Sequence, residues 1–222
     1  MTTERITIVH RDGRAPAELA AHIAAAGRAA WAARGRFTVA VSAALLDQAL
    51  VDALAAPPLR DERFWRGTRL FLADTWLPGC ELPSAALRAA VLRLPLAPGA
   101  AHVEAAGGAS AVAAAGSYEQ ELRAIFSLAA GELPRFDLCV LATDEAVASG
   151  GVPLGGRAVD EIARLVVAEF IPGARRSVVT LTPPVIQNAA AVVVVRPTRP
   201  ADAPAAIHPA PDRPCAAGAP PT

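Results

Sequence analysis

The stretch that decides the fold is Phe37-Thr38-Val39-Ala40-Val41-Ser42-Ala43-Ala44-Leu45-Leu46-Asp47, a short apolar run that leads into a turn. Residues 37–41 are apolar and rich in β-branched side chains, which predicts a buried strand. Leu45 to Ala56 is predicted to form a helix, which Pro57-Pro58 would end because proline cannot continue one. A buried strand that leads directly into a helix is the repeating unit of a parallel sheet.

The same alternation of strands and helices continues on both sides of this stretch. Further strands are predicted at Ile6–His10, Arg69–Ala73, Phe136–Leu141, Ser177–Leu181 and Ala190–Arg196, and further helices at Pro16–Arg34, Pro83–Arg93, Tyr118–Ala130 and Val159–Phe170. Most of these strands are apolar on both faces, as in sheets covered by helices on each side. The sequence therefore predicts an α/β fold, a three-layer αβα sandwich with a mainly parallel, Rossmann-like sheet. The domain is expected to span residues 1–196, and the Pro- and Ala-rich segment 197–222 to be a disordered tail.

The composition excludes several classes of partner. The 222 residues carry 21 basic and 21 acidic side chains, and every basic residue is Arg. Nucleic acids and anionic membranes need a local excess of positive charge, so we expect neither as a partner. No apolar run reaches the about 20 residues of a membrane span, and Met1–Arg5 leads into no signal-type apolar core. Cys80, Cys139 and Cys215 lack metal-ligand spacing, so no metal or cofactor is implied, and we expect a cytoplasmic protein.

Motifs along the chain resemble those of one enzyme family. The opening stretch stands where this family has a strand ending in Ser-Gly-Gly-Ser-Thr-Pro. The other matches, in order, are Trp65–Pro78 with Asp74, Ser84 before a helix, Tyr118–Leu122, Phe136–Leu141, Asp144–Ser149 and Arg176–Ala190. Together they cover about residues 15–196 and resemble the 6-phosphogluconolactonases and the related glucosamine-6-phosphate isomerases.

The resemblance implies a phosphate-binding loop whose key residues have changed here. In the family, Gly-Gly-Ser-Thr wraps the sugar phosphate with backbone N–H groups and hydroxyls, and glycine lets the backbone approach the anion closely. This chain has Ala43-Ala44 in place of the glycines, and Leu45 and Leu46 in place of the hydroxyls. Leucine donates no hydrogen bond, so the stretch is interpreted as an ordinary turn packed by leucines, with a retained phosphate loop as the alternative.

The catalytic residues implied by the resemblance are also incomplete. Lactone hydrolysis needs a base to activate water, and the family uses the His of its Asp-Gly-His motif. That position is Ala146 here. His102 is the one histidine that could fold toward the site, and the alternative is that it is a surface or strand-edge residue. Asp74 matches the Asp of the family's Asp-Glu-Arg, but its Arg position holds Trp76. The catalytic candidates are therefore Asp74 and Asp144.

Several polar residues remain as candidates for substrate binding: Ser42, Ser84, Ser149, Arg157 and Arg176. Arg157 follows Gly155-Gly156 and could replace the lost guanidinium, or it could be a solvated charge at a helix start. Asp61-Glu62-Arg63 spells the family triplet, but it precedes its expected strand and is interpreted as a solvated charge cluster.

Three hypotheses follow for the function. The first is a catalytically impaired or silent family member that acts as a binding or interaction protein, with a sugar phosphate or an unidentified protein as its partner. The second is a working, divergent lactonase that converts 6-phosphogluconolactone to 6-phosphogluconate. The third is an unrelated α/β domain with an accidental match. The second requires an anion site, and the first does not.

Overall fold

The computed structural model describes residues 6–11, 14–77, 85–103, 110–142, 157–172 and 176–197. Within these ranges the strands are β1 (Ile6–Arg11), β2 (Phe37–Val41), β3 (Thr68–Leu72), β4 (Asp74–Leu77), β5 (Ala101–His102), β6 (Leu138–Ala142), β7 (Val166–Ile171), β8 (Arg176–Leu181) and β9 (Val192–Pro197). The α-helices are α1 (Ala15–Arg34), α2 (Gln48–Ala55), α3 (Ala85–Leu92), α4 (Ala111–Phe126) and α5 (Pro183–Gln187).

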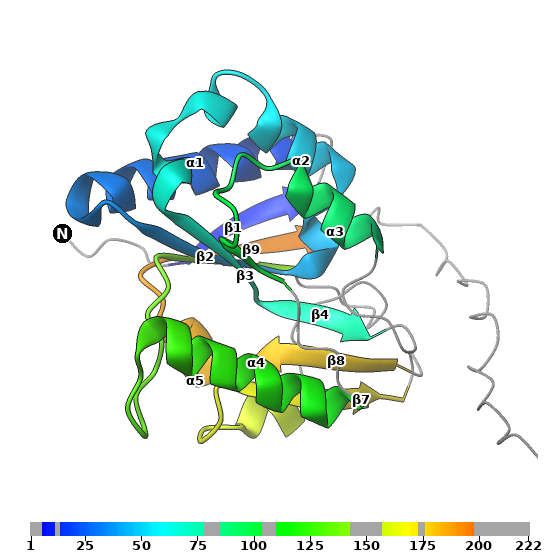
Figure 1. Ribbon diagram of the computed structural model, residues 1–222. Helices are drawn as coiled ribbons and strands as arrows, with labels where there is room; N and C mark the ends of the chain where they lie inside the picture. Colours follow the sequence, from blue (N-terminus) through cyan, green and yellow to red (C-terminus); the bar gives the residue numbers. More distant parts are fainter. Residues whose placement is uncertain are drawn as a thin grey trace, which may run out of the picture.

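The larger sheet contains six strands in the order β1-β9-β6-β2-β3-β5, and all its paired strands are parallel. One of its two central strands is β2, whose buried residues Phe37, Val39 and Val41 face the helices α1, α2 and α3. The α/β prediction with a mainly parallel sheet between helical layers is therefore confirmed (Figure 1).

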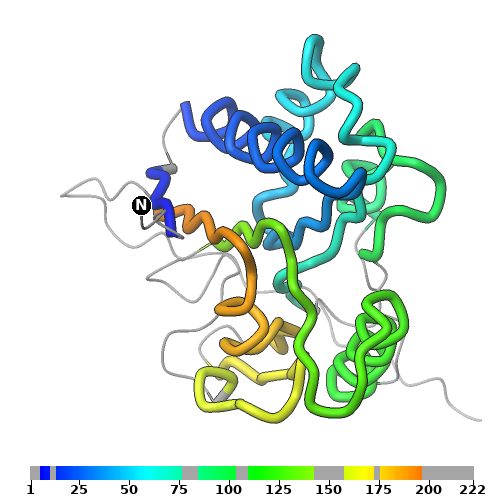
Figure 2. The backbone as a smooth tube through the Cα atoms, turned by 90° about the vertical axis from the view of Figure 1, so that its left-hand side faces the viewer, coloured from blue at the N-terminus to red at the C-terminus, as the bar shows by residue number. Residues whose placement is uncertain are grey.

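The layer on the other face of this sheet contains a second sheet that the sequence did not predict. It has three antiparallel strands in the order β4-β8-β7. Helix α4 packs on β7 and β8, and the core between them includes Tyr118, Leu122, Val179 and Leu181. Figures 1 and 2 show α4, α5, β7 and β8 together in the lower half of the molecule.

The predicted helix over Val159–Phe170 is wrong. This segment holds a short 3₁₀ turn at Arg157–Asp160 and then strand β7. Val166, Val167 and Ala168 pair with Leu181, Thr180 and Val179 of β8. Short apolar runs fit either periodicity, and here the β-branched pair Val166-Val167 and the tertiary pairing decide for a strand.

Other predicted elements are confirmed with shifted ends. Helix α4 begins at Ala111 instead of Tyr118, because Ser110 caps it by accepting a hydrogen bond from the Ala113 N–H at 3.2 Å. It ends at Phe126, and Ser127 follows in the left-handed region with φ of 53°. The tail predicted at 197–222 lies outside the described residues, apart from the backbone of Pro197, so it stays a prediction.

Candidate functional site

The loop after β2 is a 3₁₀ turn whose leucines belong to the protein core. Leu45 and Leu46 are 5% and 4% exposed and join the cluster beneath α1 and α2. Asp47 then caps α2, with its carboxylate accepting a hydrogen bond from the Leu50 N–H at 3.0 Å. The interpretation of this stretch as a turn packed by leucines is therefore confirmed.

The side chain of Ser42 links three strand ends. Its hydroxyl donates a hydrogen bond to Asp74 Oδ2 and accepts one from the Ala142 N–H at 2.9 Å. Its backbone N–H also donates to the Val140 carbonyl at 2.9 Å. Parallel strands bring their carboxyl ends to one edge of the sheet, which is where ligands bind in open α/β folds. Ser42 and Asp74, both candidates from the sequence, thus meet at that edge.

The carboxylate of Asp74 is buried, with an exposed fraction of 2%. Burial raises the pKa of Asp74 to about 6, although the hydrogen bond from Ser42 opposes this shift. Its second oxygen, Oδ1, has no hydrogen-bond partner among the described residues. A carboxyl group with such a pKa can hold or release a proton near neutral pH.

The position of Asp74 follows from a sharp change of strand. β3 ends at Leu72, and after Ala73 the chain enters β4, which pairs with β8 in the second sheet. The Leu181 N–H donates to the Ala73 carbonyl at 2.8 Å and fixes this step. The strand predicted from the sequence ended at Ala73, and none was predicted for residues 74–77. β4 escaped prediction because it is four residues long and its partner lies about a hundred positions away.

Tyr118, which the sequence placed in a motif match but not among the site candidates, holds the end of β3. The Tyr118 hydroxyl donates to the Leu72 carbonyl at 2.8 Å and accepts from the Leu72 N–H at 3.0 Å. It occupies the place of a neighbouring strand beyond the end of β5, where Phe71 pairs with His102. Burial raises the pKa of Tyr118, so the phenol stays protonated. The available signal was the chain's only tyrosine, four positions before Leu122 on the apolar face of a predicted helix.

Of the remaining candidates, the structure describes the side chain of Arg176 alone, and it does not bring this residue to Asp74. Ser84, Asp144, Ala146 and Ser149 lie outside the described residues, as does the side chain of Arg157. Arg176 is exposed at the start of β8, four residues from Thr180, the residue paired with Asp74. Four residues of strand span about 13 Å, which places Arg176 at the opposite end of β4.

His102 lies on an edge strand, which confirms the prediction of a surface or strand-edge residue. It lies on β5, the last strand of the larger sheet, and its ring stacks on Phe71 with centroids 4.7 Å apart. Its Nδ1 lies 2.8 Å from Glu121 Oε1 on α4. Its Nε2 is buried and has no partner among the described residues.

The triplet Asp61-Glu62-Arg63 lies in the 3₁₀ turns before β3, at the amino-terminal edge of the sheet. Glu62 forms an ion pair with Arg28 of α1 at 2.9 Å, and the triplet lines an open surface groove there. This groove lies away from the edge that carries Asp74, so the structure supports the interpretation of a solvated charge cluster.

Within the described part of the chain, no three His, Cys, Asp or Glu side chains are grouped to hold a metal ion. None of the helices in those same ranges combines the length and apolar character needed to cross a bilayer.

The comparisons with known proteins agree with the fold and with the resemblance to one family. The family model described as glucosamine-6-phosphate isomerases/6-phosphogluconolactonase matches residues 12–207. The 6-phosphogluconolactonase from Trypanosoma brucei is 22% identical with a TM-score of 0.62, covering 86% of this chain and 81% of that chain. The one from Thermotoga maritima is 13% identical with a TM-score of 0.64, covering 87% of this chain and 100% of that chain.

No curated protein matches the sequence. At such low identities the solved structures show the fold alone, whereas the family model spans most of the chain. The chain therefore belongs to the family of glucosamine-6-phosphate isomerases and 6-phosphogluconolactonases.

Proposed function

We propose that this protein keeps the family fold without the family's sugar-phosphate reaction, and that it acts as a binding or interaction protein. The observation that carries the proposal is the loop after β2. Leu45 and Leu46 stand where the resemblance places phosphate-binding hydroxyls, and both are buried in the core. Exposing them to rebuild a hydroxyl-lined loop would lose about 1.5–3 kcal/mol of burial for each leucine.

The electrostatics of α2 support the same conclusion. A helix N-terminus attracts an anion through its free N–H groups and its dipole. Here the Asp47 carboxylate already accepts a hydrogen bond from the Leu50 N–H at 3.0 Å. A sugar phosphate placed at this helix start would meet a fixed negative charge. The Asp47 carboxylate thus already interacts with the partial positive charge at the start of α2.

A second candidate function is a working, divergent lactonase, and one observation favours it. Asp74 is buried at the carboxyl-end edge of the sheet, and burial raises its pKa to about 6. A carboxylate with this pKa is a stronger base than an ordinary aspartate and is mostly ionised at pH 7.5. It could activate water in place of the missing histidine.

Hydrolysis of freshly prepared 6-phosphogluconolactone separates the two candidates. The rate with purified protein is compared with the spontaneous rate, with the Thermotoga maritima 6-phosphogluconolactonase as the active control. We expect no acceleration by the wild type at high protein concentration. An acceleration that falls in Asp74→Asn or Asp144→Ala would contradict the proposal and establish the second candidate. Arg60→Ala serves as the matched control for a lost surface charge, because Arg60 is exposed in the turn Leu59–Asp61 before β3, at the amino-terminal edge of the sheet.

The partner that we propose is a sugar-like ligand or another protein, with the cytoplasm as the location. Purification from the native host followed by light scattering tests the protein partner. A co-purifying protein in stoichiometric amount supports it, and a clean monomer counts against it.

A further inference from the structure

A surface groove lies at the amino-terminal edge of the larger sheet, opposite the edge that carries Asp74. It is open, has a volume of about 440 Å³, and is formed between helix α1 and the 3₁₀ turns Leu59–Asp61 and Arg63–Gly67. The partly exposed ring of Trp31 and the exposed ring of Pro58 belong to its wall. Its charged lining consists of Arg28, Asp61, Glu62 and Arg63. The groove therefore offers an apolar surface among side chains of both charge signs.

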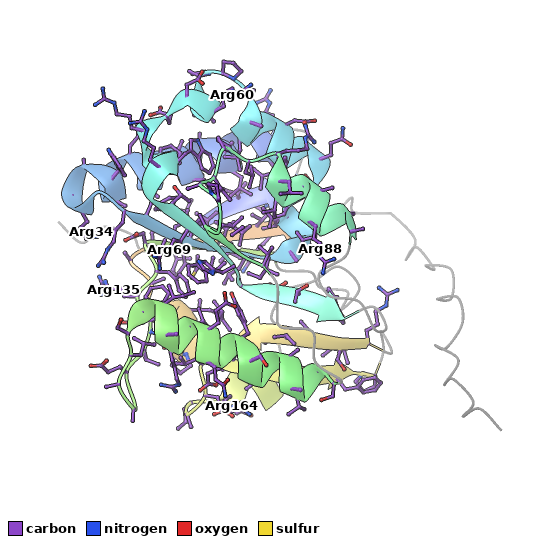
Figure 3. The ribbon with its side chains drawn as sticks, viewed as in Figure 1. Arg34, Arg60, Arg69, Arg88, Arg135 and Arg164 are labelled. Atoms are coloured by element: carbon purple, nitrogen blue, oxygen red, sulfur yellow. The ribbon has the colours of Figure 1, made fainter. Side chains whose placement is uncertain are left out.

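Three arginines lie around a single carboxylate at the same edge of the sheet (Figure 3). Arg34, at the end of α1, forms an ion pair with Asp137. The Asp137 carboxylate also accepts a hydrogen bond from the Thr38 N–H at 2.8 Å, and Thr38 pairs with Arg69 across β2 and β3. Arg135 precedes Asp137 by two residues, and Figure 3 shows it beside Arg34 and Arg69 at the left of the molecule. Positive charge therefore exceeds negative charge among the described residues at this place.

Most of this positive charge is not neutralised within the described part of the chain. Arg69 and Arg135 are exposed, and their side chains form no hydrogen bond or ion pair with another described residue. The same holds for Arg36 and Arg66, which stand directly before β2 and within the 3₁₀ turn that leads into β3. Together with Arg34 these four residues form the arginine patch. It concentrates charge of one sign in a chain that has 21 basic and 21 acidic residues.

The groove and the arginine patch form one continuous surface. Trp31 of the groove and Arg34 of the patch are three residues apart on α1, so they are neighbours on the helix surface. In the turn before β3, a Cβ on Gly67 would lie 2.7 Å from the Trp31 ring and 3.1 Å from the Arg36 Cα. Glycine is required at this position because the indole and the backbone before β2 both approach it closely. Trp31 therefore lies between the groove and the patch.

The chemistry of this surface restricts its partner. Guanidinium groups bind carboxylates and phosphates through paired hydrogen bonds, so the arginine patch requires an anionic partner. A nucleic acid or an anionic membrane presents phosphates throughout, and these would be repelled by Asp61 and Glu62 in the adjoining groove. A protein segment can place carboxylates over the patch alone and an apolar side chain in the groove. Trp and Arg are also among the side chains that most often dominate protein–protein binding energy.

We infer that this surface binds a partner protein through an acidic segment that carries one apolar side chain. Carboxylates of the segment pair with the arginine patch, and the apolar side chain packs on Trp31 in the groove. The inference rests on the proposed function, because it names the surface and the kind of protein partner for a binding role. The surface lies at the edge of the sheet opposite Ser42 and Asp74, so binding there does not compete with a ligand at that other edge.

The test follows the Trp31 indole N–H resonance of ¹⁵N-labelled protein during titration with the end-blocked peptide Asp-Glu-Asp-Leu-Asp-Glu-Asp, which presents acids on both sides of one leucine. Trp31→Phe identifies the resonance by removing it. We expect a saturable shift with a Kd below about 1 mM at low salt, and weaker binding as salt is added. Affinity should fall about tenfold in the double variant Arg69→Ala/Arg135→Ala. It should stay unchanged in Arg164→Ala, because Arg164 is an exposed arginine at the bottom of Figure 3, away from the patch.

Three results would overturn the inference. The first is an unmoved Trp31 resonance in the wild type at about 5 mM peptide, a result that needs no variant to fold. The second is an unchanged affinity when Asn and Gln replace the acids of the peptide, or when the double variant replaces the wild type. The third is tighter binding of an oligothymidylate or of phosphatidylserine vesicles than of the peptide, which would assign the surface to a nucleic acid or a membrane.

Lactone hydrolysis remains a separate assay of the other edge of the sheet. A protein that binds the peptide and accelerates hydrolysis would contradict the proposed loss of the family reaction and leave the partner surface in place. A protein that does neither would contradict the partner surface alone. The two failures are therefore distinguishable.

Discussion

The Ser42 hydroxyl donates a hydrogen bond to the Asp74 carboxylate and so joins the carboxyl end of β2 to the first residue of β4. The same oxygen accepts from the Ala142 N–H after the pairing between β2 and β6 has ended. One serine therefore connects the larger sheet to the smaller one at the edge where ligands bind in this class of fold. It is also the only hydrogen-bond partner of the Asp74 side chain among the described residues.

Removing this serine should destabilise the protein strongly. Ser42→Ala leaves a buried carboxylate without a partner and an unpaired Ala142 N–H, for an expected loss of about 2–5 kcal/mol at pH 8. Chemical denaturation measures the change. Ser110→Ala is the control, because it removes one exposed helix cap and should cost about 1 kcal/mol. Equal losses in the two variants would show that the Ser42–Asp74 link contributes little.

Asp74 should make the stability depend on pH. Burial favours the protonated form and raises the pKa of Asp74 from its ordinary 3.8 to about 6 in the folded protein. Between these values the unfolded chain has released a proton that the folded protein still holds, so the free energy of unfolding falls as pH rises. The contribution is fully present below about pH 4 and has fallen by about 3 kcal/mol above pH 6.

Asp74→Asn removes this titration and keeps an oxygen that can accept from Ser42. The variant should therefore be more stable than the wild type at pH 8, with the difference shrinking toward pH 4. Denaturation curves at pH 4, 6 and 8 measure this. A variant that loses the same stability at each pH would rule out a raised pKa for Asp74.

Most strands of the larger sheet could be predicted because each is marked by its own residues and by the helix next to it in the sequence. β2, β3, β6 and β9 are short apolar runs next to helices with clear stops, such as Gly35 after α1. The smaller sheet depends on contacts between distant segments, so β4 was not predicted and β7 was predicted as part of a helix.

The site was predictable only in part for a similar reason. Ser42 and Asp74 could be chosen from motif positions, and their contact follows from the parallel order of β2 and β3. The indole nitrogen of Trp76 is buried without a hydrogen-bond partner among the described residues. This could not be predicted, since it depends on the face that β4 presents after the chain changes sheet. Tyr118 likewise bonds to a residue 46 positions away.

Tyr118→Phe tests how the end of β3 is held. The substitution keeps the ring and removes both hydrogen bonds to Leu72, which leaves a buried N–H and carbonyl unpaired. We expect a loss of about 2–4 kcal/mol in the free energy of unfolding, with little change in the far-ultraviolet circular dichroism. Thr68→Val is the matched control, because it removes one hydrogen bond, to the Phe64 carbonyl. A smaller loss of unfolding free energy in Tyr118→Phe than in Thr68→Val would contradict the claim that Tyr118 holds the end of β3.

Two helical glycines should respond to alanine in opposite ways. A Cβ on Gly27 of α1 would lie 2.6 Å from the ring of Phe64, which is fully buried, so Gly27→Ala should destabilise by about 1–3 kcal/mol. A Cβ on Gly116 of α4 meets nothing closer than 4.0 Å, so Gly116→Ala should stabilise by about 0.5–1 kcal/mol. Thermal unfolding of both variants gives the sign. Stabilisation by both would mean that α1 does not pack on Phe64 as described.

The central claim is that core packing and a capping carboxylate have replaced the phosphate loop after β2. Calorimetric titration with 6-phosphogluconate, the stable product of the family reaction, tests it most directly, with the Thermotoga maritima enzyme as the binding control. We predict no saturable heat from this protein at ligand concentrations up to about 10 mM. Saturable binding with a Kd below about 1 mM, weakened by added salt, would contradict the claim and show that an anion site persists.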